Sequence, residues 1–362
     1  MGTQPPIPGT TRRPTIKDVA GALGVAVSTV SNAYNRPDQL SAELRAKVFA
    51  TAAAIGYAGP HPAARGLRKQ STGQIAVLLG QSLAMTLIDP VATATLQGIA
   101  AVLSDHRLAL LLVPAQSVGG PPVVDGTLVM GLDASEPTVA RVRAYGGPVV
   151  LIDQTTDFDL PAITVGDDQA GRGIFSHVVG LGHSRIAIVV DRLQVNEVPG
   201  RVSAQASSTA TFGRASAQLR GFQLGALNAS IPWETVPVYA AAADTEVAGQ
   251  AISELVLADV PTPTVILCTS DRLAAGVMTG LLQANVRVPD DTSVVGFDDT
   301  PLARATVPPL TSVRLDHDAK GRAAARTLLA LMENRPPPEP LRAVAKIVLR
   351  STLKGPRLYD HG

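Results

Sequence analysis

From residue 75 onward, short runs of Val, Ile and Leu alternate with longer amphipathic stretches. The apolar runs include QIAVLLG, DGTLVMG, SRIAIVVD, TVILCTS and TSVVGFDD. Continuous runs of this kind are typical of parallel strands that are buried on both faces, and the stretches between them would form the covering helices. The pattern predicts an α/β body made of two doubly wound parallel-sheet units in tandem.

Two such units set edge to edge predict a clamshell. Ligands of open parallel sheets bind at the carboxyl ends of the strands, so two neighbouring sheets can enclose a small molecule. Residues 192–212 are rich in Ser, Ala, Thr and Gln, and we expect them to form a long polar loop at the rim. The acidic pairs at 167–168, 290–291 and 298–299 are expected in loops, where Asp commonly forms turns.

Near the N-terminus, three shorter helical patterns follow one another. The first places Ile16, Val19, Ala20 and Leu23 on one face, and Thr15 precedes it as a capping residue. A Gly-Val step then breaks this helix, because Gly readily adopts the backbone conformation that ends one.

The second pattern points Val30, with Ala33 or Tyr34, inward. The third begins at Ser41, another capping residue, and runs AELRAKVFATAAAIGY. Three small helices with a short turn between the first two predict a helix-turn-helix head, whose second helix enters the major groove of DNA.

The charge is distributed unevenly along the chain. Residues 1–75 carry nine Lys or Arg against three acidic residues, whereas the net charge of the whole chain is only +1. A basic head on a mildly acidic body is expected when one end meets nucleic acid. Taken alone, the charge is equally compatible with a solvated basic face.

Composition excludes several other classes of protein. Cys268 is the one cysteine, and no Cys or His cluster has metal-ligand spacing, so we expect neither a disulfide nor a metal, and no cofactor. The N-terminus lacks an apolar run of signal-peptide length, and no stretch of about 18 apolar residues could span a bilayer. We therefore expect a soluble, cytoplasmic chain without membrane partners.

These patterns divide the chain into five parts. We expect a helix-turn-helix domain over residues 15–60, a hinge and linker over 61–72, and a two-lobed effector-binding and dimerisation domain over 73–354. Residues 1–14 and 355–362 are rich in Pro and Gly and are expected to be disordered tails.

Several strings resemble one known family in the same order. TIKDVAGALGVAVSTVSNAYN, SAELRAKVFATAAAIGY and PAARGLRKQ resemble the head and hinge of the lactose-repressor-like (LacI/GalR) transcription regulators. LGHSRIAIV, LRGF, VPDDTSVVGFDDTPLA and PPLTSVRLDHDAKGRAAARTLL resemble the effector domain of that family, so the resemblance spans about residues 15 to 354. It implies a homodimeric bacterial repressor that binds a palindromic double-stranded DNA operator at the nucleoid. A small molecule in a periplasmic-binding-protein-like clamshell would switch it.

The resemblance also implies roles for residues of the head. Val27, Ser28 and Asn32 would read base edges, since Asn can pair with adenine and Val can contact a thymine methyl. Lys17 adds to the basic background around this face. The residues placed near phosphates are Thr15, Thr29, Ser31, Asn35 and Ser41. For Thr29 and Ser31, simple polarity of the helix surface remains the alternative.

Residues 61–70 resemble the hinge of the family. There a short helix forms on binding, and a leucine, here Leu67, wedges into the minor groove at the operator centre. Arg65 lies beside it and supplies basic charge. The alternative for Leu67 is an anchor onto the body.

For the effector, the resemblance points to four positions. Asp298 would bond a hydroxyl or amine of the ligand, and Ser270 stands where the family often has Asn. Gln218 replaces a common Arg, so strong recognition of a carboxylate or phosphate is not expected. Asp168, or its neighbour Asp167, is the fourth candidate. The effector would be a sugar, a nucleoside or another small metabolite, or the protein would respond to none.

Two alternatives from other classes are weaker. An enzyme would need catalytic motifs, yet the sequence has no P-loop and no G-x-S-x-G, and GLGHSR follows a helix and lacks a third glycine. His183 is expected to be structural, Cys268 a core residue and Trp233 a rim residue. A solute-binding protein of a transport system would need an export signal and no basic head. A tetramer is disfavoured because no leucine heptad follows the body.

Overall fold

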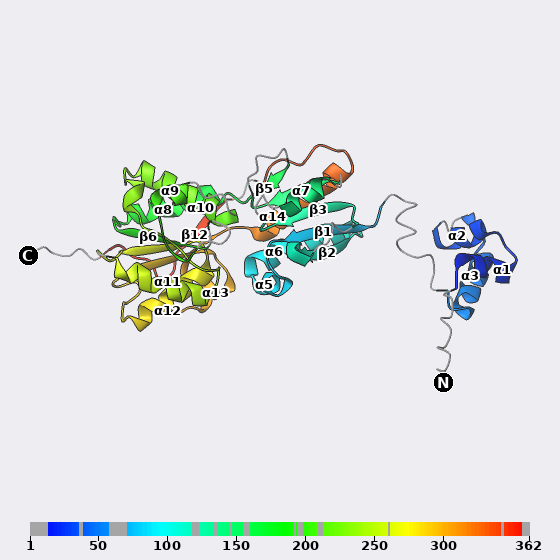
Figure 1. Ribbon diagram of the computed structural model, residues 1–362, viewed down its shortest axis with the longest axis horizontal. Coiled ribbons are helices and arrows are strands. Elements are labelled where there is room, and N and C mark those ends of the chain that lie inside the picture. The colour runs from blue at the N-terminus through cyan, green and yellow to red at the C-terminus, as the bar shows by residue number, and fades with distance from the viewer. Residues whose placement is uncertain are drawn as a thin grey trace, which may run out of the picture. The chain divides into compact units, whose positions relative to one another are not determined.

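The structure is a computed structural model of the 362-residue chain. It describes residues 14–35, 39–57, 71–117, 123–132, 137–144, 147–154, 160–191, 193, 198–208, 213–259, 261–341 and 344–356. These residues fall into two compact units, one ending at Gly73 and the other beginning at Gln74 (Figure 1).

The described part of the first unit consists of the helices α1 (Ile16–Leu23), α2 (Val27–Asn35) and α3 (Ala42–Ala54). Gly24 has φ +65°, a left-handed conformation that ends α1 and opens the expected turn. The helix α3 ends earlier than its apolar string suggests, because Gly56 is also left-handed at φ +74°. The small core consists of Val19, Ala20, Val30, Ala33, Val48 and Ala52.

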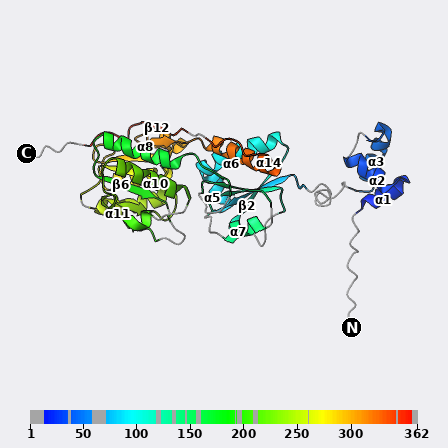
Figure 2. The same ribbon diagram turned by 90° about the horizontal axis from the view of Figure 1, so that it is seen from above.

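The first lobe of the second unit is built on a five-stranded parallel sheet with the order β2-β1-β3-β4-β5. Helices α6 and α14 cover one face of this sheet and α7 covers the other (Figure 2). Its elements are β1 (Gln74–Leu79), α5 (Leu83–Ile88), α6 (Pro90–Asp105), β2 (Ala109–Pro114), η2 (Ala115–Ser117), β3 (Gly126–Met130), α7 (Pro137–Ala144), β4 (Val149–Ile152), β5 (Ala162–Ile163) and α14 (His317–Met332).

The second lobe has a seven-stranded sheet with the order β12-β11-β10-β9-β6-β8-β7. In Figure 1, α8 and α10 lie on one side of it and α11 and α12 on the other. Its elements are α8 (Asp167–Gly180), β6 (Ile186–Val190), β7 (Gly200–Val202), α9 (Ala204–Ser208), α10 (Gly213–Asn228), η3 (Trp233–Thr235), β8 (Val238–Ala240), α11 (Glu246–Ala258), β9 (Val265–Cys268), α12 (Asp271–Gln283), β10 (Ser293–Asp298), α13 (Pro301–Ala305), β11 (Thr311–Arg314) and β12 (Lys346–Val348).

The structure corrects three local predictions. The expected polar loop at 192–212 contains the strand β7 and the helix α9, because β7 pairs antiparallel with β8 at the edge of the sheet. Asp167 and Asp168 form the first turn of α8, and Asp298 is the last residue of β10, so neither pair lies wholly in a loop. The apolar run RLALLLVPA, which the same pattern predicts as a strand buried on both faces, forms β2; it is not buried on both faces, because β2 is an edge strand and its Leu111 is exposed.

Glycines set the spacing within three helix pairs. A Cβ on Gly98 or Gly321 would meet backbone of the partner helix in the pair formed by α6 and α14. The same holds for Gly171 and Gly221 between α8 and α10, where an added Cβ on Gly221 would lie 2.1 Å from the carbonyl oxygen of Asp168. The pair of α11 and α12 repeats the arrangement at the positions Gly249 and Gly276. Each helix pair therefore packs backbone against backbone at its crossing.

The chain passes repeatedly between the two lobes. It leaves the first lobe between β5 and α8, returns between β11 and α14, and leaves again between α14 and β12. Because α14 packs against α6, the N-terminus of α14 links the end of β11 to the first lobe. This link places residues 315–320 beside both sheets.

Candidate nucleic-acid surface and ligand cleft

The outward face of α2 carries the residues predicted to read bases. Val30 and Ala33 are buried in the head, which turns Val27 and Ser28 outward, and Val27 is 41% exposed. Asn32 is half-buried, and its Nδ2 donates to Oε1 of Gln39 at 3.3 Å. The predicted reading residues thus share the side of α2 that the core does not use.

Two residues predicted to approach phosphates also cap helices. The backbone N–H and the hydroxyl of Thr15 both donate to the carboxylate of Asp18 at 2.6 Å. Oγ of Ser41 accepts from the backbone N–H of Leu44 at 3.3 Å. The hydroxyl hydrogen of Thr15 is therefore committed to Asp18, whereas that of Ser41 can still donate to a phosphate.

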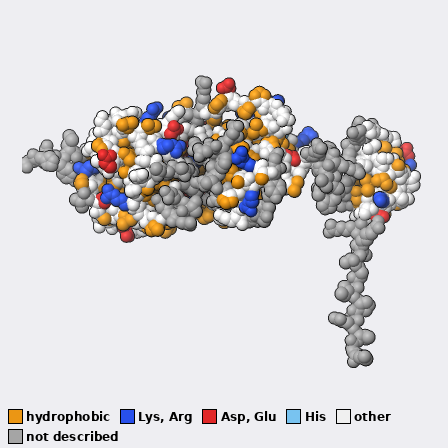
Figure 3. Space-filling view, turned by 45° about the horizontal axis from the view of Figure 1, so that its top comes forward, with side chains coloured by type: hydrophobic (Ala, Val, Ile, Leu, Met, Phe, Trp, Pro, Cys, Tyr) orange, Lys and Arg blue, Asp and Glu red, His pale blue; other side chains and the backbone are white. Residues whose placement is uncertain are grey.

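The remaining residues predicted for this surface differ in their exposure, and two of them are not described by the structure. Thr29 and Ser31 are half-buried on α2, Lys17 is exposed on α1, and Asn35 is the last residue of α2. Arg65 and Leu67 lie outside the described residues. On the face of the second unit seen in Figure 3, Lys and Arg are interspersed with Asp, Glu and hydrophobic side chains.

A cluster of buried charged groups surrounds Asp298 at the carboxyl end of β10. Asp298 is 6% exposed, and its Oδ1 accepts from Arg214 at 2.5 Å and from Nε2 of His317 at 3.0 Å. Burial alone would raise the pKa of Asp298, but Arg214 and His317 outweigh it and hold this pKa well below its usual range.

The acidic residue that α8 contributes is Asp167 rather than Asp168. Asp167 is 3% exposed, and its Oδ1 accepts from Nη2 of Arg214 and Nε2 of Gln218, each at 3.1 Å. Asp168 is exposed and lines a cavity beside it. Burial, together with Asp153 and Asp298, outweighs Arg214 and raises the pKa of Asp167.

The guanidinium that the sequence lacks at position 218 is supplied by Arg214. One helical turn separates the two positions, so both side chains lie on the same face of α10. Arg214 donates to Asp167 and to Asp298, and thus joins α8 to β10. The sequence signal that could have identified Arg214 is its position four residues before Gln218.

A second buried ion pair lies at the edge of the first lobe. The ammonium of Lys320, which is fully buried on α14, donates to Oδ2 of Asp153 just after β4. Asp153 and Asp298 both adopt left-handed backbone conformations, with φ 62° and 95°. Such conformations in residues other than glycine concentrate at functional sites. Sequence analysis missed Asp153, His317 and Lys320, because these residues come together only in the fold.

Ser270 is held within the second lobe. Its hydroxyl donates to Asp244 and accepts from the backbone N–H of Leu273 at 3.0 Å, which caps α12. Burial raises the pKa of Asp244 to about 6. Ser270 therefore caps α12 and ties it to Asp244, and its hydroxyl hydrogen is already in use.

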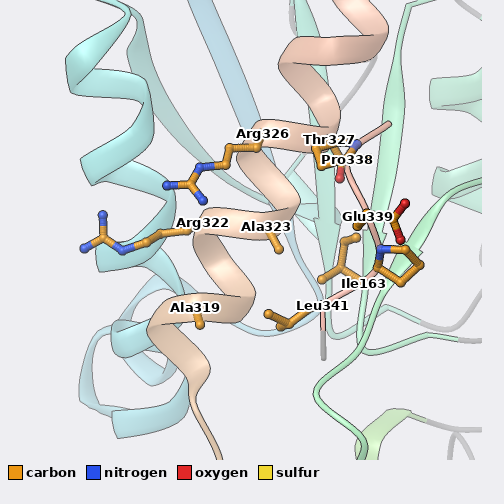
Figure 4. A pocket seen from close by; sticks show the side chains of 10 residues that line it. Ile163, Ala319, Arg322, Ala323, Arg326, Thr327, Pro338, Glu339 and Leu341 are labelled. Carbon is orange, nitrogen blue, oxygen red and sulfur yellow. The ribbon is translucent and has the colours of Figure 1, made fainter. Parts of the chain in front are cut away.

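Among the described residues, one cavity lies beside the charged cluster and another lies beside α14. The smaller, of about 170 Å³, is lined by Asp153, Asp167, Asp168, Arg214 and Arg220, among others. The larger, of about 620 Å³, lies between α14 and residues 338–341 (Figure 4). In that view Arg322 and Arg326 extend from α14 away from Glu339, and the walls are mostly Ala, Pro, Leu and Ile. We place the candidate ligand site at the smaller cavity, because the buried polar groups that can select a ligand are there.

Other residues singled out in the sequence have structural roles. His183 contacts Oγ1 of Thr264 and the carbonyl of Lys354, Cys268 is buried in the second lobe, and Trp233 donates to Ser207. Within the described ranges, no group of three or more His, Cys, Asp and Glu residues could hold a metal ion. The helices of the described part of the chain are too short or too polar to cross a membrane.

Comparisons with known proteins cover both units. Residues 15–59 match the model of the bacterial regulatory proteins of the lacI family, and residues 175–353 match a periplasmic binding protein-like domain. The HTH-type transcriptional regulator IpsA of Corynebacterium glutamicum is 32% identical over 329 residues, which cover 88% of this chain and 91% of that relative.

Two solved structures have the same fold. The transcriptional regulator CelR in complex with cellobiose aligns with a TM-score of 0.68 and 22% identity, covering 94% of this chain and 100% of its own. The lac repressor dimer bound to operator and the anti-inducer ONPF aligns with a TM-score of 0.72 and 23% identity, covering 94% and 99%.

Proposed function

Because this chain belongs to the lacI family of bacterial regulatory proteins, whose members are DNA-binding transcription regulators and not enzymes, we propose that it is a repressor. It binds a palindromic operator as a homodimer, and a small-molecule effector in the cleft between its lobes switches it. It acts in the bacterial cytoplasm, at the nucleoid.

The observation that carries the operator proposal is the exposed face of α2. Asn32, Ser28 and Val27 offer an amide, a hydroxyl and a methyl-bearing side chain, which are the groups that distinguish base edges in the major groove. Lys17 and the basic residues of the head add sequence-independent attraction to phosphates. Specificity and affinity thus come from different residues.

The effector proposal rests on the charged cluster beside the small cavity. Asp153 and Lys320 belong to the first lobe, whereas Asp167, Arg214 and Asp298 belong to the second. A ligand held by both sets changes how the lobes meet, and therefore the placement of the segments that lead to the head. CelR and the lac repressor share the fold of this chain, and their structures contain cellobiose and the anti-inducer ONPF. These complexes support the proposal that the cleft binds an effector.

Exposed apolar side chains support the homodimer. On the first lobe, Leu87 and Ile88 of α5 are 60% and 62% exposed near the edge strand β2. On the second lobe, Val247 of α11 and Leu282 of α12 are 77% and 73% exposed. In the proposed dimer, a second copy of this chain covers these side chains, and the lac repressor, a relative in fold, was solved as a dimer.

The test is a titration of the full-length protein against DNA at several salt concentrations. Palindromic duplexes enriched from a random library are compared with scrambled duplexes of equal length. We expect an affinity advantage of about 10³-fold or more for the enriched palindrome, and a linear fall of log K with log salt. Equal affinity for all duplexes would overturn the proposal, and would leave open a solute-binding protein as the rival with the same two-lobed body.

A further inference from the structure

The charges of the cleft do not balance. Among the described residues, the buried cluster contains three carboxylates, Asp153, Asp167 and Asp298, but only two permanent cations, Arg214 and Lys320. The exposed rim adds one of each sign, Asp168 and Arg220, so the surplus of one negative charge remains. Five of these seven charged groups, Asp153, Asp167, Asp168, Arg214 and Arg220, line the small cavity, and they too carry one more negative than positive charge.

His317 does not supply the missing positive charge. Burial and the neighbouring Lys320 lower the pKa of His317, so its ring is neutral near pH 7. A neutral ring that donates from Nε2 to Asp298 leaves Nδ1 as an acceptor. Burial first, and then the neighbouring Asp153 and Asp298, raise the pKa of Asp167, so this site disfavours a further negative charge.

Three of the buried side-chain atoms that lack a hydrogen-bond partner belong to the charged cluster or to residues bonded to it, and all three are acceptors. Gln154, which follows Asp153, has both an unpartnered donor, Nε2, and an unpartnered acceptor, Oε1. Oδ1 of Asp153, Oε1 of Gln218 and Nδ1 of His317 are buried without a donor. The side chain of Asp153 is 9% exposed and lines the small cavity. Each of these three atoms accepts, so the component that the cleft lacks is a hydrogen-bond donor.

Arg214 offers little to an anion. Four of its N–H groups are directed at Asp167 and Asp298, through Nε, Nη1 and both hydrogens of Nη2. A ligand carboxylate or phosphate would have to displace a buried carboxylate from this guanidinium, and would add negative charge to a site that already has a surplus.

We propose that the ligand of this cleft carries a protonated amine, which the carboxylates of Asp153 and Asp167 receive beside Arg214. An ammonium has three donors and one positive charge, so it satisfies the unpartnered acceptor of Asp153 and cancels the surplus charge. This inference rests on the proposed function, because it names the chemical class of the effector of that same site.

The test uses matched triplets that differ only in charge. Glucosamine, glucose and gluconate, and galactosamine, galactose and galactonate, are titrated calorimetrically into the full-length protein at pH 7, with methylamine and ethanolamine as smaller amines. We expect at least one amine to bind about tenfold tighter than its neutral parent, the gain of one charge-assisted hydrogen bond, and the acids to bind weakest. Neutral or acidic members that bind as tightly as the amine, or amines that all fail to bind, would overturn the inference.

Two variants locate the amine. D153N is expected to abolish the preference for the amine over its neutral parent. Because this change also unpairs the buried Lys320, D168N provides a milder test, and we expect it to weaken amine binding by roughly two- to fivefold. D105N, at an exposed Asp that ends α6 outside the cavity, is the matched control. An unchanged preference for the amine in D168N and in folded D153N would contradict the assignment.

The outcomes separate this inference from the proposed function. If glucose or gluconate releases the operator better than the amines do, the protein is an effector-controlled repressor and the amine assignment is wrong. If an amine binds but no duplex is selected, the assignment stands and the proposed repressor function fails.

Discussion

Asn32 is the residue of the head whose chemistry is most specific for a base. Its amide can pair with N6 and N7 of adenine, and the second hydrogen of Nδ2 remains for Gln39, which it already contacts. Lys17, by contrast, is an exposed charge on α1 that suits any phosphate. In the proposed operator complex, these two residues of one small unit would act on different parts of the binding free energy.

Replacing these residues separates specificity from affinity. We expect Asn32→Ala to cost about 1–3 kcal/mol on the preferred operator and to relax the preference at one base pair per half-site. Lys17→Ala should weaken all duplexes alike and lower the salt slope by about 1 for each protomer, or about 2 for the dimer. Fluorescence anisotropy on a panel of single-base operator variants measures both, and a uniform loss in Asn32→Ala would be the wrong outcome.

Arg214 neutralises two buried carboxylates at once, so its loss is costly. We expect Arg214→Ala to reduce the free energy of unfolding by about 3–5 kcal/mol, because Asp167 and Asp298 would remain buried without their shared partner. Arg220→Ala, on the same helix, makes a matched control, since Arg220 only reaches Ser216 at 3.4 Å. Urea unfolding compares the two variants, and equal losses would contradict this account of the cluster.

Asp271 gives stability a pH dependence of a defined sign. It accepts hydrogen bonds from Thr300 and Ser312, yet burial raises its pKa to about 7. A folded-state pKa above the unfolded value favours folding at low pH, and this contribution is lost as the pH rises through about 7. The Asp271→Asn variant lacks this titration.

We therefore expect the stability of the protein, relative to Asp271→Asn, to fall as the pH rises from 5 to 8, because the unfolded-state pKa is about 3.9 and the folded one higher. Urea unfolding of both proteins at several pH values measures the difference. A difference that stays constant over this range would show that Asp271 titrates normally.

At the scale of helices, the paired glycines position the ligand site. Gly171 of α8 and Gly221 of α10 bring these helices into backbone contact, and the same helices carry Asp167, Arg214 and Gln218. A residue larger than glycine at either position would force the helices apart. The geometry of the candidate cleft thus depends on the lack of a Cβ atom at Gly171 and Gly221.

Two neighbouring glycines of α8 test this dependence. A Cβ at Gly171 would lie 2.5 Å from the carbonyl oxygen of Gln218, whereas one at Gly173 would meet nothing within 4 Å. We expect Gly171→Ala to destabilise the protein by about 1–3 kcal/mol and Gly173→Ala to stabilise it by about 0.5–1 kcal/mol. Thermal unfolding measures both, and the same sign in both variants would refute the contact.

The strands that the sequence predicts most clearly are those that are buried on both faces. The runs at β1, β6, β9 and β10 are buried along almost their whole length, so their apolar composition alone identifies them. The edge strands β7 and β12 are short, and their composition is mixed because one side of each faces solvent. Their pairing depends on a neighbouring strand, which the local sequence does not specify.

At the scale of the whole molecule, α14 contacts residues of both lobes. Its first residue, His317, contacts Asp298 of the second lobe, and Lys320, one turn later, pairs with Asp153 of the first. A ligand that changes either contact shifts the relation of the lobes. Under the proposed function, operator and effector binding would then be linked thermodynamically.

We expect the linkage to be reciprocal. An effector that changes operator affinity by some factor, roughly 5- to 150-fold, must have its own affinity changed by the same factor when operator is bound. Calorimetric titration of the ligand with and without saturating operator measures it. Ligand affinity that is identical in both titrations would exclude control through this cleft.

The sequence by itself determined the kinds of element and the class of protein. Apolar runs, helix caps and the Gly24 turn follow from interactions between residues close in the chain, and the ordered motifs identified the family. Tertiary structure alone decided the candidate ligand site, because its residues are separated along the chain and meet only when the lobes and α14 pack. These residues are Asp153, Arg214, His317 and Lys320. Their chemistry depends on shared burial, and burial is a property of the packed molecule that local sequence does not contain.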